Sequence, residues 1–493
     1  MSRKIEKLAI ANRGEVAVRI IRAAQEMGIR TALLHSEADI ETLAYRLADE
    51  RVLIGGSPVN ESYLNIEKNI DGAKSVEADA IHPGFGFLSE NAEFAKACEK
   101  ARITFIGPTP ESIELFGDKI SAKNLVDKVG APTIPGYQGE DQAVQTLISR
   151  AQEIGFPVMV KAAGGGGGRG LRVIHSEEQA AEVIESARRE ARNAFGSEKL
   201  FLEKYLDKAK HIEVQIFGDS SGKVYHLFER ECSVQRRHQK VIEEAGAANL
   251  DPMIKQKMFT TAIEIAEHAK YRGAGTVEFL YQDGEFYFLE MNTRLQVEHP
   301  VTEMILGIDL VKAQIQTAEG QSLLWSQEDL RPNGHAIECR LYAEDSYNGG
   351  MPSTGRLGST HFPSGPGRRF EIGFEAGDEI TSNYDSMIGK IVVWDESRYR
   401  ALRRMKLTLA ETIVFGLKTN IPYLMEILSH HEFVDGKMTT QFIDKNFPNG
   451  LESEALTEDD QELSEILKPM IGSAGEAGSS SVPNPWTSKW GKS

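Results

Sequence analysis

Two glutamates on either side of a short turn are the first residues whose types and spacing suggest chemistry. Glu278 and Glu290 lie in strand-like segments that flank Asp283-Gly284, a pattern typical of a hairpin. A two-residue turn would place the two glutamates on opposite faces, whereas a three-residue turn, 282–284, places them on one face as diagonal neighbours. We expect the three-residue turn, because two carboxylates on one face can share Mg²⁺ (or Mn²⁺) and leave its other positions to nucleotide phosphates.

A dense run of polar residues follows the second glutamate. Asn292 can bind or orient the metal ion, and Arg294 and Gln296, alternating on an extended segment, can donate hydrogen bonds to a small anion. Glu298 can act as a general base. We expect His299 to be a hydrogen-bonded turn residue. The run indicates a binding site rather than a solvated loop.

Five consecutive glycines mark a second candidate site. Gly164–Gly168 lie between the strand-like segments VMVK and LRVI, with Lys161 at the end of the first segment. Glycine-rich backbone can bring several N–H groups onto an anion. Strands on both sides distinguish this loop from a Walker loop or a dinucleotide-binding turn. The pattern predicts a hairpin flap over a polyphosphate, with Lys161 contacting a phosphate oxygen.

The elements that position these residues begin with strand–helix alternation over about the first 115 residues. Strands at 7–11 and 29–34 flank an amphipathic helix at 15–27, which ends at Gly28. The alternation predicts a parallel sheet with covering helices. The turn at 11–15 lacks GxGxxG, so we expect a Rossmann-like layer without a dinucleotide.

The rest of the chain mixes strands with a few helices. The spacing predicts helices at 118–129, 142–154, 252–271 and 399–415, and strands at 157–162 and 171–174 around the glycine loop. The segment 201–447 is otherwise rich in strands. The last stretch, 448–493, is rich in Gly, Ser and Pro towards its end, and we expect a flexible tail.

Composition limits the class of protein. The 493 residues carry a formal net charge of −17, which argues against a nucleic-acid binder. The sequence holds no apolar run of membrane-spanning length and no signal-peptide pattern, so we expect a cytoplasmic enzyme without a membrane partner. The three cysteines are far apart and lack CxxC spacing, so we expect packed thiols at Cys98, Cys232 and Cys339.

Several motifs together resemble the biotin carboxylases of the ATP-grasp superfamily over residues 5–447. The motifs are ANRGEVAVRIIRA (11–23), HPGFGFLSEN (82–91), GDK (117–119), KAAGGGGGRG (161–170), EKY (203–205), ERECSVQRRHQKVIEEA (229–245), GTVEF (275–279), EMNTRLQVEHPVTE (290–303), IECRLYAED (337–345) and YDSMIGK (384–390). The glycine motif alone would be weak evidence. RLQVEHP together with QRRHQK and IECR is highly specific.

The resemblance implies an α/β (overall α+β) enzyme of three units. These are a Rossmann-like N-terminal biotin carboxylase domain at 1–116, an ATP-grasp domain at 117–330 with a mobile lid at about 134–205, and a C-terminal biotin carboxylase domain at 331–447. The tail at 448–493 lies beyond the resemblance.

The resemblance also assigns roles to individual residues. Metal ligands would be Glu278, Glu290 and Asn292, and the bicarbonate pocket would comprise Lys240, Arg294, Gln296, Val297 and Glu298. Arg340 would face biotin, and the catalytic set would be Glu298, Arg294, Lys240 and Arg340. ATP contacts would be Lys119, Lys161, Gly165, Gly166, Gly167, Gly168, Glu203, Lys204, Leu206, His211, Gln235, His238 and Leu280.

The implied activity is ATP-dependent carboxylation of biotin by bicarbonate through carboxyphosphate. Met405-Lys406-Leu407 falls in an expected helix and not in a biotin-bearing hairpin, so we expect biotin on a separate carrier protein. The partners would be this carrier and a carboxyltransferase, in a homodimeric subunit of acetyl-CoA carboxylase for fatty acid biosynthesis. Another acyl-CoA carboxylase, such as a propionyl-CoA one, or a two-subunit pyruvate carboxylase is the alternative.

Two other classes of protein are less consistent with the sequence. A carbamoyl-phosphate or purine-pathway ATP-grasp enzyme would share the lid and the metal pair, but RLQVEHP and IECR argue against it. A non-catalytic nucleotide-binding scaffold would be expected to lack Glu298, Lys240 or Arg340, and all three are present.

Overall fold

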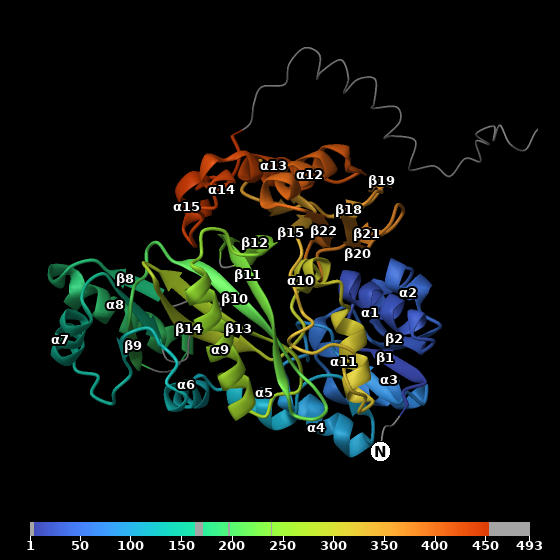
Figure 1. Ribbon diagram of the computed structural model, residues 1–493, viewed down its shortest axis with the longest axis horizontal. Coiled ribbons are helices and arrows are strands. Elements are labelled where there is room, and N and C mark those ends of the chain that lie inside the picture. Colours follow the sequence, from blue (N-terminus) through green and yellow to red (C-terminus); the bar gives the residue numbers. More distant parts are fainter. Residues whose placement is uncertain (1–3, 163–170, 196–197, 238, 453–493) are drawn as a thin grey trace, which may run out of the picture.

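Three α/β units surround a central sheet in the computed structural model (Figure 1). The structure describes residues 4–162, 171–195, 198–237 and 239–452, without the side chains of 119, 120, 171, 194 and 195. None of the helices in these ranges combines the length and the apolar character that crossing a membrane requires.

The N-terminal unit is a five-stranded parallel sheet in the order β3-β2-β1-β4-β5. Its strands are β1 (Lys7–Ile10), β2 (Arg30–Ser36), β3 (Glu50–Gly55), β4 (Ala80–His82) and β5 (Thr104–Phe105). Its helices are α1 (Gly14–Glu26), α2 (Leu43–Leu47), α3 (Ile66–Ser75), α4 (Ala92–Ala101) and α5 (Pro110–Gly117). The apolar stripe of α1 is buried with β1 in one core. The predicted parallel α/β layer is therefore confirmed.

A small antiparallel sheet, in the order β6-β9-β7-β8, forms the next unit, which we call the lid sheet. Its strands are β6 (Gly136–Tyr137), β7 (Val158–Ala162), β8 (Leu171–Ile174) and β9 (Leu200–Lys204). Helices α7 (Val144–Ile154) and α8 (Glu177–Phe195) share a core with it, whereas α6 (Lys119–Lys128) packs against α5 and α9 (Pro252–His268). Val158 and Val160 point into a core with α7 and α8, so Lys161 belongs to the other face. Strands β7 and β8 pair antiparallel, as predicted for the two sides of the glycine loop.

The central sheet has eight strands in the order β14-β13-β10-β11-β12-β15-β22-β20. They are β10 (Lys210–Gly218), β11 (Val224–Arg236), β12 (Gln239–Ala245), β13 (Gly273–Gln282), β14 (Glu285–Asn292), β15 (His335–Tyr342), β20 (Arg368–Ile372) and β22 (Met387–Asp395). Helices α9 (Pro252–His268), α10 (His299–Leu306) and α11 (Leu310–Ala318) connect or cover them. Because β12 pairs with β15, one sheet continues across the expected boundary at 330/331.

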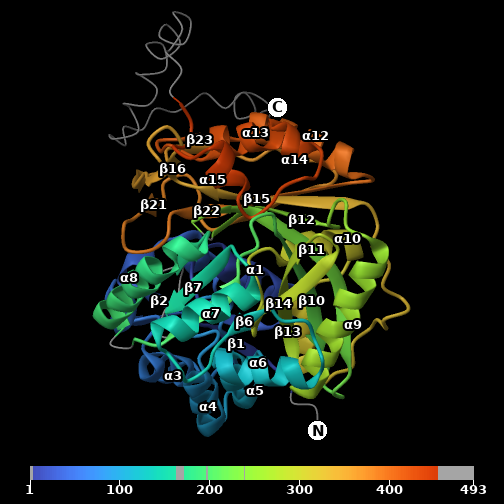
Figure 2. The same cartoon turned by 90° about the vertical axis from the view of Figure 1, so that its left-hand side faces the viewer.

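Helices α12 (Arg398–Glu411), α13 (Ile421–Ser429), α14 (His431–Val434) and α15 (Phe442–Asn446) cover the C-terminal end of this sheet (Figure 2). Short strands complete the unit: β16 (Glu344–Asp345), β17 (Met351–Pro352), β18 (Gly355–Arg356), β19 (Ser359–His361), β21 (Glu379–Ile380) and β23 (Ile413–Phe415).

The structure differs from one expectation about this unit and describes only part of another. The helix expected at 399–415 ends at Glu411, because Ile413–Phe415 pairs with β19 as strand β23. Of the expected tail, residues 448–452 are described, and Leu451 packs on the C-terminal core while its N–H donates to the Ser346 carbonyl. Residues 453–493 lie outside the described ranges.

Candidate active site

The hairpin that carries the two glutamates corrects the predicted turn. Gln282 pairs with Glu285, so the turn has two residues, and Asp283 and Gly284 both adopt positive φ. A β-bulge then leaves Leu289 unpaired and restores the register. Glu278 therefore lies directly opposite Glu290, and their side chains share a face as direct rather than diagonal neighbours.

The three predicted metal ligands line one strip of this face. Asn292 follows Glu290 by two residues, and its Nδ2 donates to Glu278 Oε1 at 3.0 Å. The Glu290 side chain is exposed at the surface. Its pKa is nevertheless raised, first by the desolvation that the surrounding protein atoms cause and then by the charge of Glu278. Two carboxylates and a carboxamide are the oxygen donors that Mg²⁺ prefers, and a cation between them would relieve the repulsion. The residues therefore fit the predicted metal.

Lys240, on β12, binds three carboxylates. Its Nζ lies 2.5 Å from Glu213 Oε2, 2.8 Å from Glu278 Oε1 and 2.6 Å from Glu298 Oε1. Burial favours the neutral amine, but these three charges outweigh it and raise the pKa of Lys240 well above its ordinary value. Lys240 thus stays charged and joins the predicted metal site to the predicted general base.

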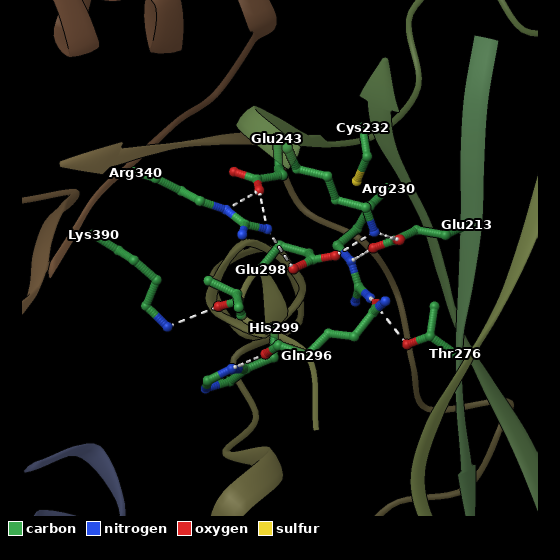
Figure 3. Close-up of polar contacts among 12 residues, drawn as sticks. Glu213, Arg230, Cys232, Glu243, Thr276, Gln296, Glu298, His299, Arg340 and Lys390 are labelled. Atoms are coloured by element: carbon green, nitrogen blue, oxygen red, sulfur yellow. Dashed lines mark hydrogen bonds and ion pairs between the residues drawn. The ribbon is translucent and has the colours of Figure 1, made fainter. Parts of the chain in front are cut away.

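Glu298 is the residue at which two cations meet (Figure 3). It is the N-cap residue of α10, and its Oε2 accepts from Arg340 Nη2 at 3.0 Å while Lys240 holds the other oxygen. Burial opposes ionisation of Glu298, but the charges of Lys240 and Arg340 outweigh it and lower its pKa. Glu298 is therefore an ionised carboxylate at neutral pH, as a proton acceptor must be.

Arg340 also donates to Glu243. The distance from Arg340 Nε to Glu243 Oε1 is 2.6 Å, and both side chains are buried. Burial raises the pKa of Glu243 to about 7, with the charge of Arg340 opposing the rise. Arg340 therefore reaches Glu298 from a fixed position on β15.

The predicted anion-binding residues lie in the loop between β14 and α10. Arg294 and Gln296 do not continue an extended strand as we expected, because β14 ends at Asn292 and the chain turns before α10. Arg294 donates through Nε to Glu90 Oε2 at 2.9 Å and through Nη2 to Asn292 Oδ1 at 2.9 Å. Gln296 donates to Glu278 Oε1 at 2.8 Å. The turn therefore brings Gln296 to Glu278, a carboxylate that Lys240 also binds, and Arg294 to the neighbouring Asn292.

Arg230, a buried residue of β11, connects several residues of the site. Its side chain is fully buried and its donors bind five side chains, which are Glu213, Gln215, Thr276, Gln296 and Thr302. Because these acceptors come from β10, β13, the loop and α10, Arg230 fixes their relative positions.

The predicted nucleotide residues fall into two groups. On the lid sheet, Lys161 forms an ion pair with Glu203, and Lys204 Nζ donates to the Gly155 carbonyl at 2.7 Å. On the central sheet, His211 Nδ1 lies 3.1 Å from Gln235 Nε2.

The remaining predicted nucleotide residues are either half-buried or outside the described residues. Leu206 and Leu280 are half-buried. The Lys119 side chain, Gly165–Gly168 and His238 lie outside the described residues.

Several supporting residues were not predicted. Glu213 binds both Arg230 and Lys240. Glu243 binds Arg340, and Glu90 binds Arg294. One signal was available for Glu213, because His211, Glu213 and Gln215 alternate as polar residues in an otherwise apolar strand. Such a polar face inside a buried strand indicates a site.

The structure also places the residues that were not expected to take part in catalysis. His299 Nδ1 bonds the Gln296 carbonyl at 2.7 Å, as expected, but His299 is the first residue of α10 and not a turn residue. Cys232 is a fully buried thiol, as expected, and burial raises its pKa. Arg236, in the QRRHQK motif, pairs with Glu344. Met405 and Lys406 are in α12, not in a hairpin.

Comparisons with known families match almost the whole described chain. The N-terminal domain of biotin carboxylase matches residues 4–113, the ATP-binding domain of the carbamoyl-phosphate synthase L chain matches 118–325, and the biotin carboxylase C-terminal domain matches 338–445.

Individual proteins are similar to this chain over most of its length. Biotin carboxylase of Pseudomonas aeruginosa is 46% identical over 90% of this chain and 98% of its own. The mitochondrial methylcrotonoyl-CoA carboxylase subunit alpha of Dictyostelium discoideum is 46% identical over 99% of this chain, which spans 70% of that relative and 63% of the length of its mouse counterpart.

Among solved structures, one neighbour is the biotin carboxylase domain dimer of the Hydrogenobacter thermophilus 2-oxoglutarate carboxylase, in complex with MgADP, ADP and bicarbonate. It has a TM-score of 0.85 and 45% identity, and the match covers 92% of this chain and all of that one.

Proposed function

The chain belongs to the biotin carboxylase family of ATP-grasp ligases, and we propose that it carboxylates biotin with bicarbonate and ATP through the residues assembled around Glu298. The observation that carries these assignments is that Lys240 and Arg340 hold the two oxygens of one ionised carboxylate. That carboxylate lies beside the anion-binding loop and the Glu278–Glu290 pair.

The first step is phosphorylation of bicarbonate. Lys240, Arg294 and Gln296 bind the anion, and Glu298 takes its proton as a bicarbonate oxygen attacks the γ-phosphorus of ATP. The bond from this phosphorus to the bridging oxygen breaks, and ADP and carboxyphosphate form. A bicarbonate that competes for Lys240 would leave Glu298 with fewer cations, which raises its pKa and makes it a better base.

The second step carboxylates biotin. Carboxyphosphate breaks down to CO₂ and phosphate, and the phosphate removes the proton from the biotin ureido nitrogen. Arg340 stabilises the negative oxygen of the deprotonated ureido group, and the nitrogen attacks CO₂. Because Glu243 and Glu298 fix the Arg340 guanidinium, this donor is positioned before biotin binds.

Glu278, Glu290 and Asn292 would hold Mg²⁺. When bound, the ion supplies charge neutralisation for the polyphosphate. Lys161, with Glu203 beside it, would contact phosphate oxygens from the lid sheet.

We propose that biotin comes on a carrier protein and that a carboxyltransferase passes the carboxyl group to the final acceptor, with this chain acting as a homodimer. The dimer formed by the biotin carboxylase domain of the 2-oxoglutarate carboxylase supports the oligomeric state. Acetyl-CoA carboxylase is our first assignment. Another acyl-CoA carboxylase or a keto-acid carboxylase such as that of pyruvate is the alternative, because both acceptor classes occur among the similar proteins.

Phosphate release by the purified chain tests the reaction. We expect release from Mg-ATP to require bicarbonate and to rise with free biotin. Release that is indifferent to both would contradict the proposed reaction. Adding candidate carrier and carboxyltransferase proteins with acetyl-CoA, methylcrotonoyl-CoA or pyruvate then identifies the acceptor.

A further inference from the structure

A buried lysine outside the predicted site binds the backbone next to the general base. Lys390 is on β22, its side chain is fully buried, and its Nζ donates to the Val297 carbonyl at 2.7 Å (Figure 3). The same Nζ lies 3.2 Å from Glu15 Oε1, a carboxylate in the first turn of α1. A buried lysine is uncommon and requires such partners.

The register of the central sheet places this lysine beside the arginine that binds Glu298. Lys390 is directly opposite Arg340 in the β15–β22 pair, so the two side chains lie on the same face. Arg340 binds the side chain of Glu298, while Lys390 binds the carbonyl of the preceding residue, Val297. Two neighbouring cations therefore hold two consecutive residues of one loop.

The two contacts constrain different degrees of freedom. A trans peptide is planar, so fixing the Val297 carbonyl also fixes the direction of the Glu298 N–H, which points the opposite way. It also sets the starting direction of the Glu298 side chain at the N-cap of α10. Arg340 and Lys240 then fix the far end of that side chain.

Acidic side chains lie near the two cations on three elements. Glu371 faces Lys390 from β20, and Glu15 approaches it from α1. Glu338, two residues before Arg340 on β15, is also buried. Two adjacent buried cations are costly unless such partners surround them, and this arrangement spans the N-terminal unit, the sheet and the loop.

We propose that Lys390, held by Glu15, is a positioning residue for the carboxylation reaction, because it orients the Val297–Glu298 peptide and through it the general base and the bicarbonate pocket. This inference rests on the proposed function. It predicts that the loss of Lys390 impairs the use of bicarbonate and leaves the binding of ATP nearly unchanged.

The test compares Lys390→Met with wild type in bicarbonate-dependent phosphate release. We expect kcat/KM for bicarbonate to fall about 10- to 100-fold, because small misplacements of reacting groups cost up to about 100-fold. We expect KM for ATP to stay within about twofold, because Lys390 contacts none of the predicted nucleotide residues that the structure describes. Lys390→Arg should recover part of the loss, since it keeps a buried cation and a donor.

Arg398→Met is the matched control. Arg398 also combines a carboxylate partner, Glu244, with backbone carbonyls, those of Phe433 and Val434, but it does not contact the loop. We expect its thermal unfolding temperature to fall while kcat/KM for bicarbonate stays near that of wild type.

The outcomes separate the two proposals. Wild-type phosphate release without bicarbonate dependence rejects the proposed function. With that dependence present, an unchanged kcat/KM for bicarbonate in Lys390→Met, or an equal loss for ATP, rejects the positioning role. If Lys390→Met does not fold, Glu15→Gln decides, because it should lower bicarbonate use selectively by a smaller factor, and no change would overturn the inference.

Discussion

The charged residues around Glu298 are more deeply buried and have more side-chain partners than the charged residues of the lid sheet. In the central sheet, Arg230 and Arg340 are buried, the Lys240 side chain is only 12% exposed, and each of the three bonds two or more side chains. In the lid sheet, the Lys161 and Glu203 side chains pair with each other and remain 30% and 19% exposed.

We infer from this difference that the bicarbonate half of the proposed reaction needs charges that are fixed before the substrate binds. Bicarbonate is small and offers few contacts, so its binding and activation depend on charges already fixed by their neighbours. ATP is large and offers many contacts, so a separate small sheet can present lysines to it. Buried networks of this kind are also expensive to break, whereas exposed pairs are not.

Removing the general base should give the largest effect. We expect Glu298→Gln to lower biotin carboxylation by about 10²- to 10⁴-fold, the range typical of a lost acid–base group. Binding of ATP, measured by calorimetry, should stay close to wild type, because Glu298 binds Lys240 and Arg340 and none of the described lid-sheet residues. A loss of ATP binding would make Glu298 a structural residue and remove the contrast between the two regions.

Arg340→Ala should have the next largest effect and should divide the central site itself. We expect biotin carboxylation to fall about 100-fold, the loss of one oxyanion donor, and bicarbonate-dependent ATP cleavage to fall less. The two rates are measured on the same preparation with labelled bicarbonate and with phosphate release. Equal losses would argue against a biotin-facing role.

A matched pair of lysine and arginine variants tests the comparison most directly. We expect Lys161→Met to raise KM for ATP about 10-fold, about 1.4 kcal/mol, and to change the free energy of unfolding by less than about 1 kcal/mol. Arg230→Met should destabilise the fold by about 3 to 5 kcal/mol, because it removes the cation that binds Glu213 Oε1 and leaves several other buried acceptors without their donor. Denaturant unfolding measures both, and equal destabilisation would contradict the distinction.

The smallest expected effect is a pH dependence that belongs to the buried cluster. Burial raises the pKa of Glu15 from 4.5 to about 7. Between these values the folded state binds more protons than the unfolded state, so this group lowers the free energy of unfolding as pH rises from about 4.5 to 7. Subtracting the unfolding curve of Glu15→Gln from that of wild type should show a difference that falls over this range and is flat above it.

Glu244 supplies the control with the opposite sign. Burial opposes its ionisation, but the hydrogen bond from His335 and the charges of His335 and Arg398 lower its pKa to about 2. Its stabilising contribution is present above the unfolded pKa near 4.5 and is lost as pH falls towards 2. A Glu15 difference that is flat between pH 5 and 7 would show that Glu15 is ionised in the folded state.

The sequence predicted those parts of the fold that depend on local pattern. The first strands, helix α1 and the pairing of β7 with β8 follow from periodicity and glycine content. The pairing of Glu278 with Glu290 required a bulge at Leu289, for which the sequence carries no local signal.

The supporting charges of the site depend on contacts between distant segments. Arg230 and Gln296 are 66 residues apart and meet only in the folded protein, whereas Glu213 faces Arg230 across the neighbouring strands β10 and β11. Lys390 and Glu15 belong to recognised motifs, but their contact joins the two ends of the protein. Charged residues in such motifs could be assigned to the site but not to a partner.

The pairing of β12 with β15 has a consequence for protein engineering. Because Lys240 is on β12 and Arg340 is on β15, the two cations that bind Glu298 come from opposite sides of the expected unit boundary. A chimaera that joins residues 1–330 of this chain to the C-terminal part of a relative must reproduce a strand pairing as well as a linker. Recombination by whole modules is therefore constrained at this junction, and productive crossovers should be found in loops outside the central sheet.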